Sequence, residues 1–334
     1  MPALCIAIAA LTSACTASNA GVRTSTVPPT TTSSTTIPDP FALERADSRS
    51  RQAALDLELI EGLSRRDLLG LPRALGAWDK ALVYERGCHS SWESPTVRPC
   101  ALGAVTGPLV VVSGDSHAAQ LQPMFSAWAK KRNWRFISIT KSGCPIVTVK
   151  PVLAEESKLA LRLPYPSCVK WQQAALARIE QLAPDVVVLP LLSRRGLTEP
   201  GGIKTWSREI TATVSRLAAT TRVVVLGDDP QVGIDIPKCL ARTKDPARCA
   251  ISIEKAVLPE RLDAERTAAS SGGGEWFDIT SWFCAPAGCP ATSGRFVTRR
   301  DDNHATASFA AHIWPRLDPV INPWGSDPGV PATG

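Results

Sequence analysis

From about residue 105 the chain alternates short, nearly continuous runs of branched apolar residues with longer segments of mixed polarity. Uninterrupted Val, Ile and Leu are typical of parallel strands that are buried on both faces. The predicted strands are Leu109–Ser113, Arg135–Ile139, Val186–Leu191, Arg222–Leu226 and Trp276–Ile279. The predicted helices are His117–Lys131, Val169–Leu182, Thr205–Ala219, Glu254–Ser270 and Thr306–Leu317. This alternation predicts an α/β fold, a three-layer α/β/α sandwich with a central parallel sheet.

The chain before residue 105 has a different pattern. Residues 41–80 place apolar side chains among many charges, which predicts helix. The apolar positions are Leu55, Leu57, Leu59, Ile60 and Leu63. We therefore expect residues 41–104 to form an N-terminal helical extension packed on a main domain at residues 105–318, with a C-terminal tail at residues 319–334.

The N-terminus has the features of an export signal. Ala3–Leu11 is an apolar run of the length found in signal peptides, although no Lys or Arg precedes it, and small residues follow. We expect a signal peptide at residues 1–20, with a lipid anchor at Cys15 as an alternative, because Leu11-Thr-Ser-Ala-Cys15 resembles a lipobox. Residues 21–40 are rich in Thr, Ser and Pro, which predicts a disordered linker. No other apolar run is long enough to span a membrane, so we expect the remainder to be soluble. The export signal predicts an extracytoplasmic location.

The cysteines also favour an oxidising compartment. Apart from Cys5 and Cys15 they are even in number and fall into four local pairs, as in exported proteins. Nearest-neighbour pairing is the simplest of about 105 connectivities, and it joins Cys88 to Cys100, Cys144 to Cys168, Cys239 to Cys249 and Cys284 to Cys289. No Cys-x-x-Cys or His-x-x-x-His spacing occurs, so we expect no metal and no cofactor.

The charge of the chain gives little information about partners. The formal net charge of +6 is spread along the sequence instead of forming one basic block. No stripe of Lys and Arg is interleaved with aromatic residues, as a nucleic-acid groove would require. We therefore expect no nucleic-acid partner.

A serine lies where the first predicted strand meets its helix. The strand ends in Gly114-Asp-Ser-His117, and glycine permits the tight turn that the chain needs there. Ser116 then lies at a helix N-terminus, where backbone amides and the helix dipole favour developing negative charge. Ser116 is therefore a candidate nucleophile; the alternative is that it only caps the helix.

A serine nucleophile needs a base within hydrogen-bond reach. Asp301-Asp-Asn-His304 stands just before the last predicted helix. An aspartate three residues before a histidine can accept the Nδ1–H and leave Nε2 facing the serine. We favour Asp301 over Asp302 as this carboxylate. The other histidines fit the role less well: His89 adjoins a predicted disulfide, His117 is on the serine's own helix, and His312 is in an apolar helix where packing is expected.

These motifs, in this order, resemble the SGNH (GDSL-like) hydrolases over about residues 105–317. The similarity is greatest to the SGNH domains associated with acyltransferase-3 proteins, which modify bacterial surface glycans. In those domains Lys-Ser-Gly-Cys-Pro follows the second strand, as in Lys141–Pro145 here. A cysteine pair also precedes their Asp-x-x-His segment, as Cys284 and Cys289 do here.

The resemblance implies a Ser116–His304–Asp301 triad and an SGNH, flavodoxin-like fold. It also implies that the backbone amides of Ser116 and Gly143 donate to the oxyanion. SGNH hydrolases add an asparagine after the third strand, but this chain has Leu192-Ser-Arg-Arg-Gly196 there. The candidate replacement donors are Ser193, Arg194 and Arg195. Either arginine could instead bind an anionic group of the substrate or be a solvated loop charge.

The resemblance implies an exported serine esterase or O-acyltransferase that acts on O-acyl groups, acetyl above all, of cell-envelope carbohydrate. Its substrate would be an acylated envelope glycan or a small acyl ester, with a separate membrane acyltransferase as a candidate partner. The alternative is a catalytically silent glycan-binding module with the same fold. Candidates for stacking on sugar rings are Trp92, Trp206 and Trp282. Gly227-Asp-Asp-Pro230 follows the fourth predicted strand at the site end of the sheet; it is interpreted as a plain turn, with a place in the lining of the pocket as the alternative.

Overall fold

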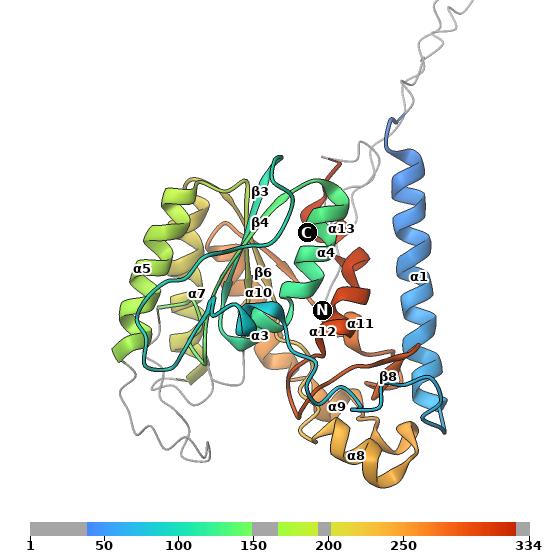
Figure 1. Ribbon diagram of the computed structural model, residues 1–334. Coiled ribbons are helices and arrows are strands. Elements are labelled where there is room, and N and C mark those ends of the chain that lie inside the picture. The colour runs from blue at the N-terminus through green and yellow to red at the C-terminus, as the bar shows by residue number, and fades with distance from the viewer. Residues whose placement is uncertain (1–38, 149–165, 193–201, 325–334) are drawn as a thin grey trace, which may run out of the picture. The chain divides into compact units, whose positions relative to one another are not determined.

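The valine-rich runs of the sequence form a parallel sheet in the computed structural model, which describes residues 39–148, 166–192 and 202–324 (Figure 1). The five main strands lie in the order β4-β3-β5-β6-β7 and are all parallel. They are β3 (Leu109–Gly114), β4 (Arg135–Lys141), β5 (Val186–Pro190), β6 (Arg222–Leu226) and β7 (Glu275–Phe277). The strand predictions are confirmed, with β7 starting one residue earlier and ending earlier than expected.

Helices cover both faces of this sheet. Val110 and Val112 point into a core shared with α4 (Gln122–Arg132) and α12 (Ala307–His312). Val111, between them, points into a second core. The helices that share this second core are α5 (Pro166–Leu182), α7 (Gly202–Ala218) and α10 (Pro259–Ser271). Successive strand residues point to opposite faces, so an apolar residue at every position builds both cores. The predicted three-layer α/β/α sandwich is confirmed.

The N-terminal extension is helical only in its first part. α1 (Ala42–Ser64) packs Leu55 and Leu59 into the core that contains α12. After it, the segment contains only the short α2 (Leu82–Glu85) and two two-residue strands, β1 (His89–Ser90) and β2 (Cys100–Ala101). Both strands pair with β4, so this part of the extension belongs to the sheet. The predicted N-terminal helical extension is confirmed, with its long helix at Ala42–Ser64.

Three predicted helices are each broken in two by a proline. Proline has no amide hydrogen to donate and is tolerated in the first turn of a helix. Pro123, Pro259 and Pro315 all lie in the first turn of the second piece. The pieces are α3 (Ser116–Gln120) and α4; α9 (Ile253–Ala256) and α10; and α12 and a 3-10 helix (Trp314–Leu317), after which α13 (Asp318–Ile321) follows.

Residues 232–249 and 291–297 add a small lobe that the pattern of the sequence did not predict. Val232, Ile236, Leu240, Ala291 and Val297 form its core. Its elements include α8 (Ile236–Thr243), a 3-10 helix (Pro246–Cys249), β8 (Thr292–Ser293) and β9 (Phe296–Val297). The intervening α11 (Thr280–Phe283) packs Trp282 and Phe283 into the core that contains α12. This lobe lies between the end of β6 and the Asp301–His304 segment in the chain.

The four predicted disulfides form as paired, 88–100, 144–168, 239–249 and 284–289. Within the described residues no helix combines the length and the apolar character needed to cross a membrane. The predicted signal peptide, Cys15 and the predicted linker lie outside the described residues, apart from the last two linker positions.

Candidate active site

Ser116 lies at the carboxyl end of β3 and is the first residue of α3. A side chain at Gly114 would place its Cβ 2.9 Å from that of Ala118 and 3.0 Å from the Pro190 carbonyl oxygen, so this turn requires glycine. Asp115 caps α3, and its carboxylate accepts the His117 amide at 2.8 Å. Asp115, and not Ser116, therefore provides the side-chain cap of α3. The side chain of Ser116 is half-buried.

Asp301 and His304 form the second part of the site. The Asp301 Oδ2 lies 2.9 Å from His304 Nδ1, and its Oδ1 accepts the backbone amides of Asn303 and His304 at 3.0 and 2.6 Å. Asp302 is exposed, so the preference for Asp301 as the partner of His304 agrees with the geometry. The His304 Nε2 is buried and has no hydrogen-bond partner among the described residues.

The two parts of the site are joined through α3. The rings of His117 and His304 lie 5.4 Å apart, centre to centre. The side-chain oxygen of Gln120 accepts the backbone amide of Ala305. One contact from each end of α3 therefore holds His304 beside the helix that begins at Ser116.

Burial and neighbouring charges set the protonation of this pair. Burial lowers the pKa of His304; the hydrogen bond to Asp301 opposes this effect, and the positive His117 adds to it. Burial alone would raise the pKa of Asp301, but the hydrogen bond to His304 and its charge outweigh it and hold the pKa below its usual range. At neutral pH the arrangement is a neutral imidazole oriented by a carboxylate, which suits a general base.

His89 is a functional candidate that the sequence did not reveal. Its Nδ1 lies 2.9 Å from Thr140 Oγ1, and its Nε2 lies 3.0 Å from Ser142 Oγ. Burial lowers the pKa of His89 to about 3, so the ring is neutral; one of its hydrogen bonds goes to β4 and the other to the turn after β4. Gly143, the expected oxyanion donor, follows in this turn at φ +53°, a conformation that favours glycine.

His117 faces away from solvent into a pair of carboxylates. Its Nδ1 lies 2.7 Å from an oxygen of Asp228 and 2.7 Å from an oxygen of Asp229. Arg299 binds the other oxygen of Asp229. Three such side chains could in principle ligate a metal ion, but the arginine already neutralises one carboxylate. The set suits a buried imidazolium better than a metal ion.

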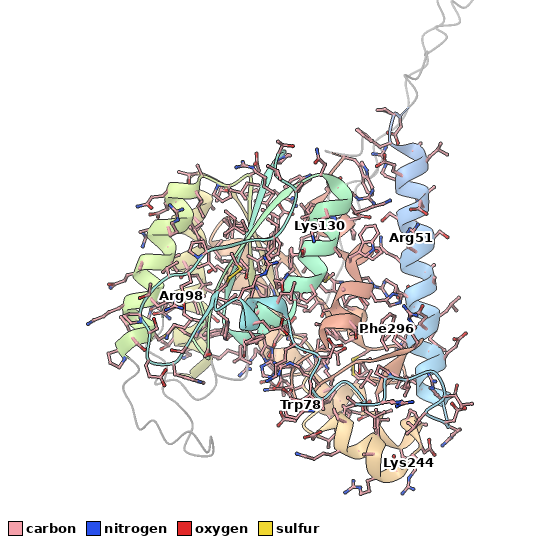
Figure 2. The ribbon with its side chains drawn as sticks, viewed as in Figure 1. Arg51, Trp78, Arg98, Lys130, Lys244 and Phe296 are labelled. Atoms are coloured by element: carbon pink, nitrogen blue, oxygen red, sulfur yellow. A yellow bond between two sulfur atoms is a disulfide. The ribbon has the colours of Figure 1, made fainter. Side chains whose placement is uncertain are left out.

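The structure also gives the burial and contacts of other residues that the sequence analysis singled out. The fully buried Trp206 and the nearly buried Trp282 cannot stack on a sugar, so these two predictions were wrong. Trp92 is half-buried, whereas Trp78 is 80% exposed. Trp78 is labelled in Figure 2. His312, expected to pack, stacks on Phe296 and also binds Glu58 at 2.8 Å. The candidate donors Ser193, Arg194 and Arg195 lie outside the described residues.

The fold and the site together define an α/β/α protein with a serine at the end of its first long strand and an Asp-x-x-His segment beside it. Residues 87–319 match the family described as SGNH domain (fused to AT3 domains). This chain therefore belongs to the SGNH domain family, and the predicted enzyme class, ester hydrolase or O-acyltransferase, is confirmed.

Several solved structures are similar to this chain. The periplasmic domain of a lipopolysaccharide acetyltransferase from Salmonella ser. Paratyphi A has a TM-score of 0.52 at 16% identity, with 84% of this chain and 98% of that chain covered. A family 2 carbohydrate esterase from Corynascus has a TM-score of 0.39 at 12% identity, with coverage of 66% and 67%. An aryl esterase from M. smegmatis has a TM-score of 0.40 at 15% identity, with coverage of 65% and 99%. No curated protein matches the sequence.

Proposed function

We propose that this protein is an exported O-acyl esterase or O-acyltransferase of cell-envelope carbohydrate, with Ser116 as nucleophile, His304 as base and Asp301 as its orienting carboxylate. The observation that carries the proposal is His304 itself. Its Nδ1 is bound to Asp301, while its Nε2 is buried beside the helix of Ser116 with no partner in the part of the chain that the structure describes. An unpartnered buried nitrogen is costly, and it is the atom that a serine hydroxyl would bind.

The chemistry follows from this geometry. The Ser116 hydroxyl gives its proton to His304 Nε2 as its oxygen bonds to the ester carbonyl carbon. The amides of Ser116 and Gly143 donate to the oxygen that becomes negative. The His304 proton then passes to the departing alcohol as the ester C–O bond breaks, which leaves an acyl-Ser116 ester. Water releases the acyl group as an acid, whereas a sugar hydroxyl takes it up in a transfer reaction.

Three observations support a carbohydrate substrate outside the cytoplasm. The family is described as fused to AT3 domains, and the neighbour with the highest TM-score among those reported above is an acetyltransferase of lipopolysaccharide. Four disulfides suit an oxidising compartment. Trp78 is 80% exposed, with the Lys80 Nζ 5.9 Å from its ring centre. It lies near the site, since the carbonyl oxygen of the adjacent Asp79 accepts the amide of Ala307, three residues after His304, at 3.1 Å. A separate membrane acyltransferase would supply acyl groups if the protein is a transferase.

The test is ester turnover by the purified mature protein. Release of acetate is measured from an aryl acetate and from an O-acetylated glycan, and acetyl transfer is measured by adding a sugar acceptor. We expect Ser116→Ala to lose activity at least about 10³-fold. Ser113→Ala is the matched control, since Ser113 lies three residues earlier and its buried hydroxyl has no partner among the described side chains. An inactive wild type would favour a silent glycan-binding module, and full activity of Ser116→Ala would exclude the proposed triad.

A further inference from the structure

A buried cluster of charged side chains surrounds His117, the residue that follows the candidate nucleophile Ser116. His117 is 2% exposed, and its Nδ1 lies 2.7 Å from both Asp228 and Asp229. The two aspartates follow the end of β6, at the same sheet edge as Ser116. A nitrogen between two carboxylate oxygens must carry a proton for both contacts to be favourable. Arg299 neutralises only one of the two carboxylates, so charge balance in this buried cluster favours an imidazolium at His117.

The cluster is closed by further polar partners. Arg299, itself 1% exposed, binds Asp229 and also donates to the Pro230 carbonyl oxygen at 2.9 Å. Gln231 donates to the second oxygen of Asp228 at 3.1 Å. Two cations then balance two anions, which is what burial of so many charges requires. Burial alone would lower the pKa of His117, but the two carboxylates outweigh it and raise the pKa well above its usual range.

The cluster is also connected to both halves of the candidate triad. His117 is the residue after Ser116, and its ring centre is 5.4 Å from that of His304. Gln120 donates to Asp229 at 2.8 Å and accepts the amide of Ala305. Three segments far apart in the sequence, namely α3, the turn after β6 and the Asp301–His304 segment, therefore meet at this cluster.

We propose that His117, held by Asp228 and Asp229, is a positioning residue that fixes α3 against the His304 segment and keeps a permanent positive charge beside His304. The inference deepens the proposed function and rests on it, because its effect is exerted through the serine and base of that reaction.

The charge has a definite consequence for the base. His304 must be neutral to accept the serine proton, and a neighbouring cation opposes its protonation. The charged and titratable groups that face His304 are Asp301 and Arg300 of its own segment, His117 of α3 and His89 of β1. Of these, burial keeps His89 neutral. His117 and Arg300 therefore both lower the pKa of His304, whereas Asp301 raises it. Removal of the His117 charge should raise the pKa of His304.

The size of the shift follows from the distance. A unit charge at 5.4 Å moves a pKa by about 0.5 in a medium like water and by about 2 at an effective dielectric constant near 20. His117→Gln removes the charge and retains a group that can donate to one carboxylate. We expect the acidic limb of its kcat/KM profile to move to higher pH by about 0.5 to 2 pH units, with a plateau about 10- to 100-fold lower.

Gln120→Met is the matched control. It loses the hydrogen bonds to Asp229 and Ala305, on the same short helix, without changing any charge. We expect its plateau rate to fall while its acidic limb stays at the wild-type pH. If His117 were only a packing residue, His117→Gln would behave like Gln120→Met, with a lower rate and an unmoved limb, and the inference would be wrong.

A measurement on the wild-type protein keeps the inference testable if His117→Gln does not fold. The chain has four histidines, and nitrogen-15 NMR of their rings reports each protonation state. We expect one ring, assigned to His117, to stay protonated on both nitrogens from pH 5 to 8, and a neutral His117 at pH 7 would overturn the inference. So would a stoichiometric metal ion bound by the wild type and lost in His117→Gln. Activity unaffected by Ser116→Ala would instead refute the proposed function itself.

Discussion

Replacement of Asp301 by asparagine tests how the base is oriented. In the structure one carboxylate oxygen faces His304 Nδ1 at 2.9 Å, and the other accepts two backbone amides. Asparagine can retain the contacts to the amides, but its NH2 group then faces Nδ1. Nδ1 must become the acceptor, so the ring proton moves to Nε2, the atom that should receive the Ser116 proton.

The expected loss has two parts. A hydrogen bond to a charged group contributes about 1.5–3 kcal/mol, which corresponds to a factor of about 10 to 150 in rate. The inverted tautomer adds to this, since the ring must turn or exchange its proton before each turnover. We therefore expect kcat to fall by roughly 10³- to 10⁴-fold. Since Asp301 raises the pKa of His304, the acidic limb of the residual activity should move to lower pH.

The assay is steady-state hydrolysis of an aryl acetate as a function of pH. Asp302→Asn is the control, because Asp302 is adjacent and exposed, and we expect its kcat to stay within about three-fold of wild type. Equal losses in the two variants, or a limb that moves to higher pH in Asp301→Asn, would refute this account of the base.

Three further predictions concern other parts of the protein. Burial lowers the pKa of His304, so the acidic limb of wild-type kcat/KM should lie below about pH 6.5; a midpoint at pH 7 or above would contradict this. Trp78→Ala should raise KM for an acetylated glycan about 10-fold or more and leave aryl acetate kinetics unchanged, and equal effects on both substrates would argue against a stacking role. Replacing both Cys144 and Cys168 by serine should lower the free energy of unfolding by about 3.5 kcal/mol, because the disulfide closes a loop of 24 residues. Denaturant titration under non-reducing conditions measures this change, and an unchanged midpoint would show that the disulfide does not stabilise the fold.

The sheet and the Asp301–His304 pair could be predicted because each depends on residues close together in the sequence. An apolar residue at every strand position indicates burial on both faces, as the opposite orientations of Val110 and Val111 demonstrate. The offset between Asp301 and His304 lets the carboxylate reach Nδ1 within one turn of chain.

Contacts between distant segments could not be predicted in this way. His89 is in a strand of two residues, too short to give a pattern, and it binds Ser142, 53 residues later. Asp228 and Asp229 have the composition of a turn, and only the position of β6 relative to α3 brings them to His117. The burial of Trp206 likewise depends on where α7 packs, because tryptophan occurs both in cores and at sugar sites.

The central claim is that Ser116 forms the covalent intermediate. The most direct measurement is labelling with a fluorophosphonate, followed by peptide mass spectrometry to locate the adduct, in wild type, Ser113→Ala and His304→Ala. The account predicts one adduct per chain, on Ser116, at the wild-type rate in Ser113→Ala and at least about 100-fold more slowly in His304→Ala. An adduct on another serine, or labelling of Ser116 at an unchanged rate without His304, would contradict it.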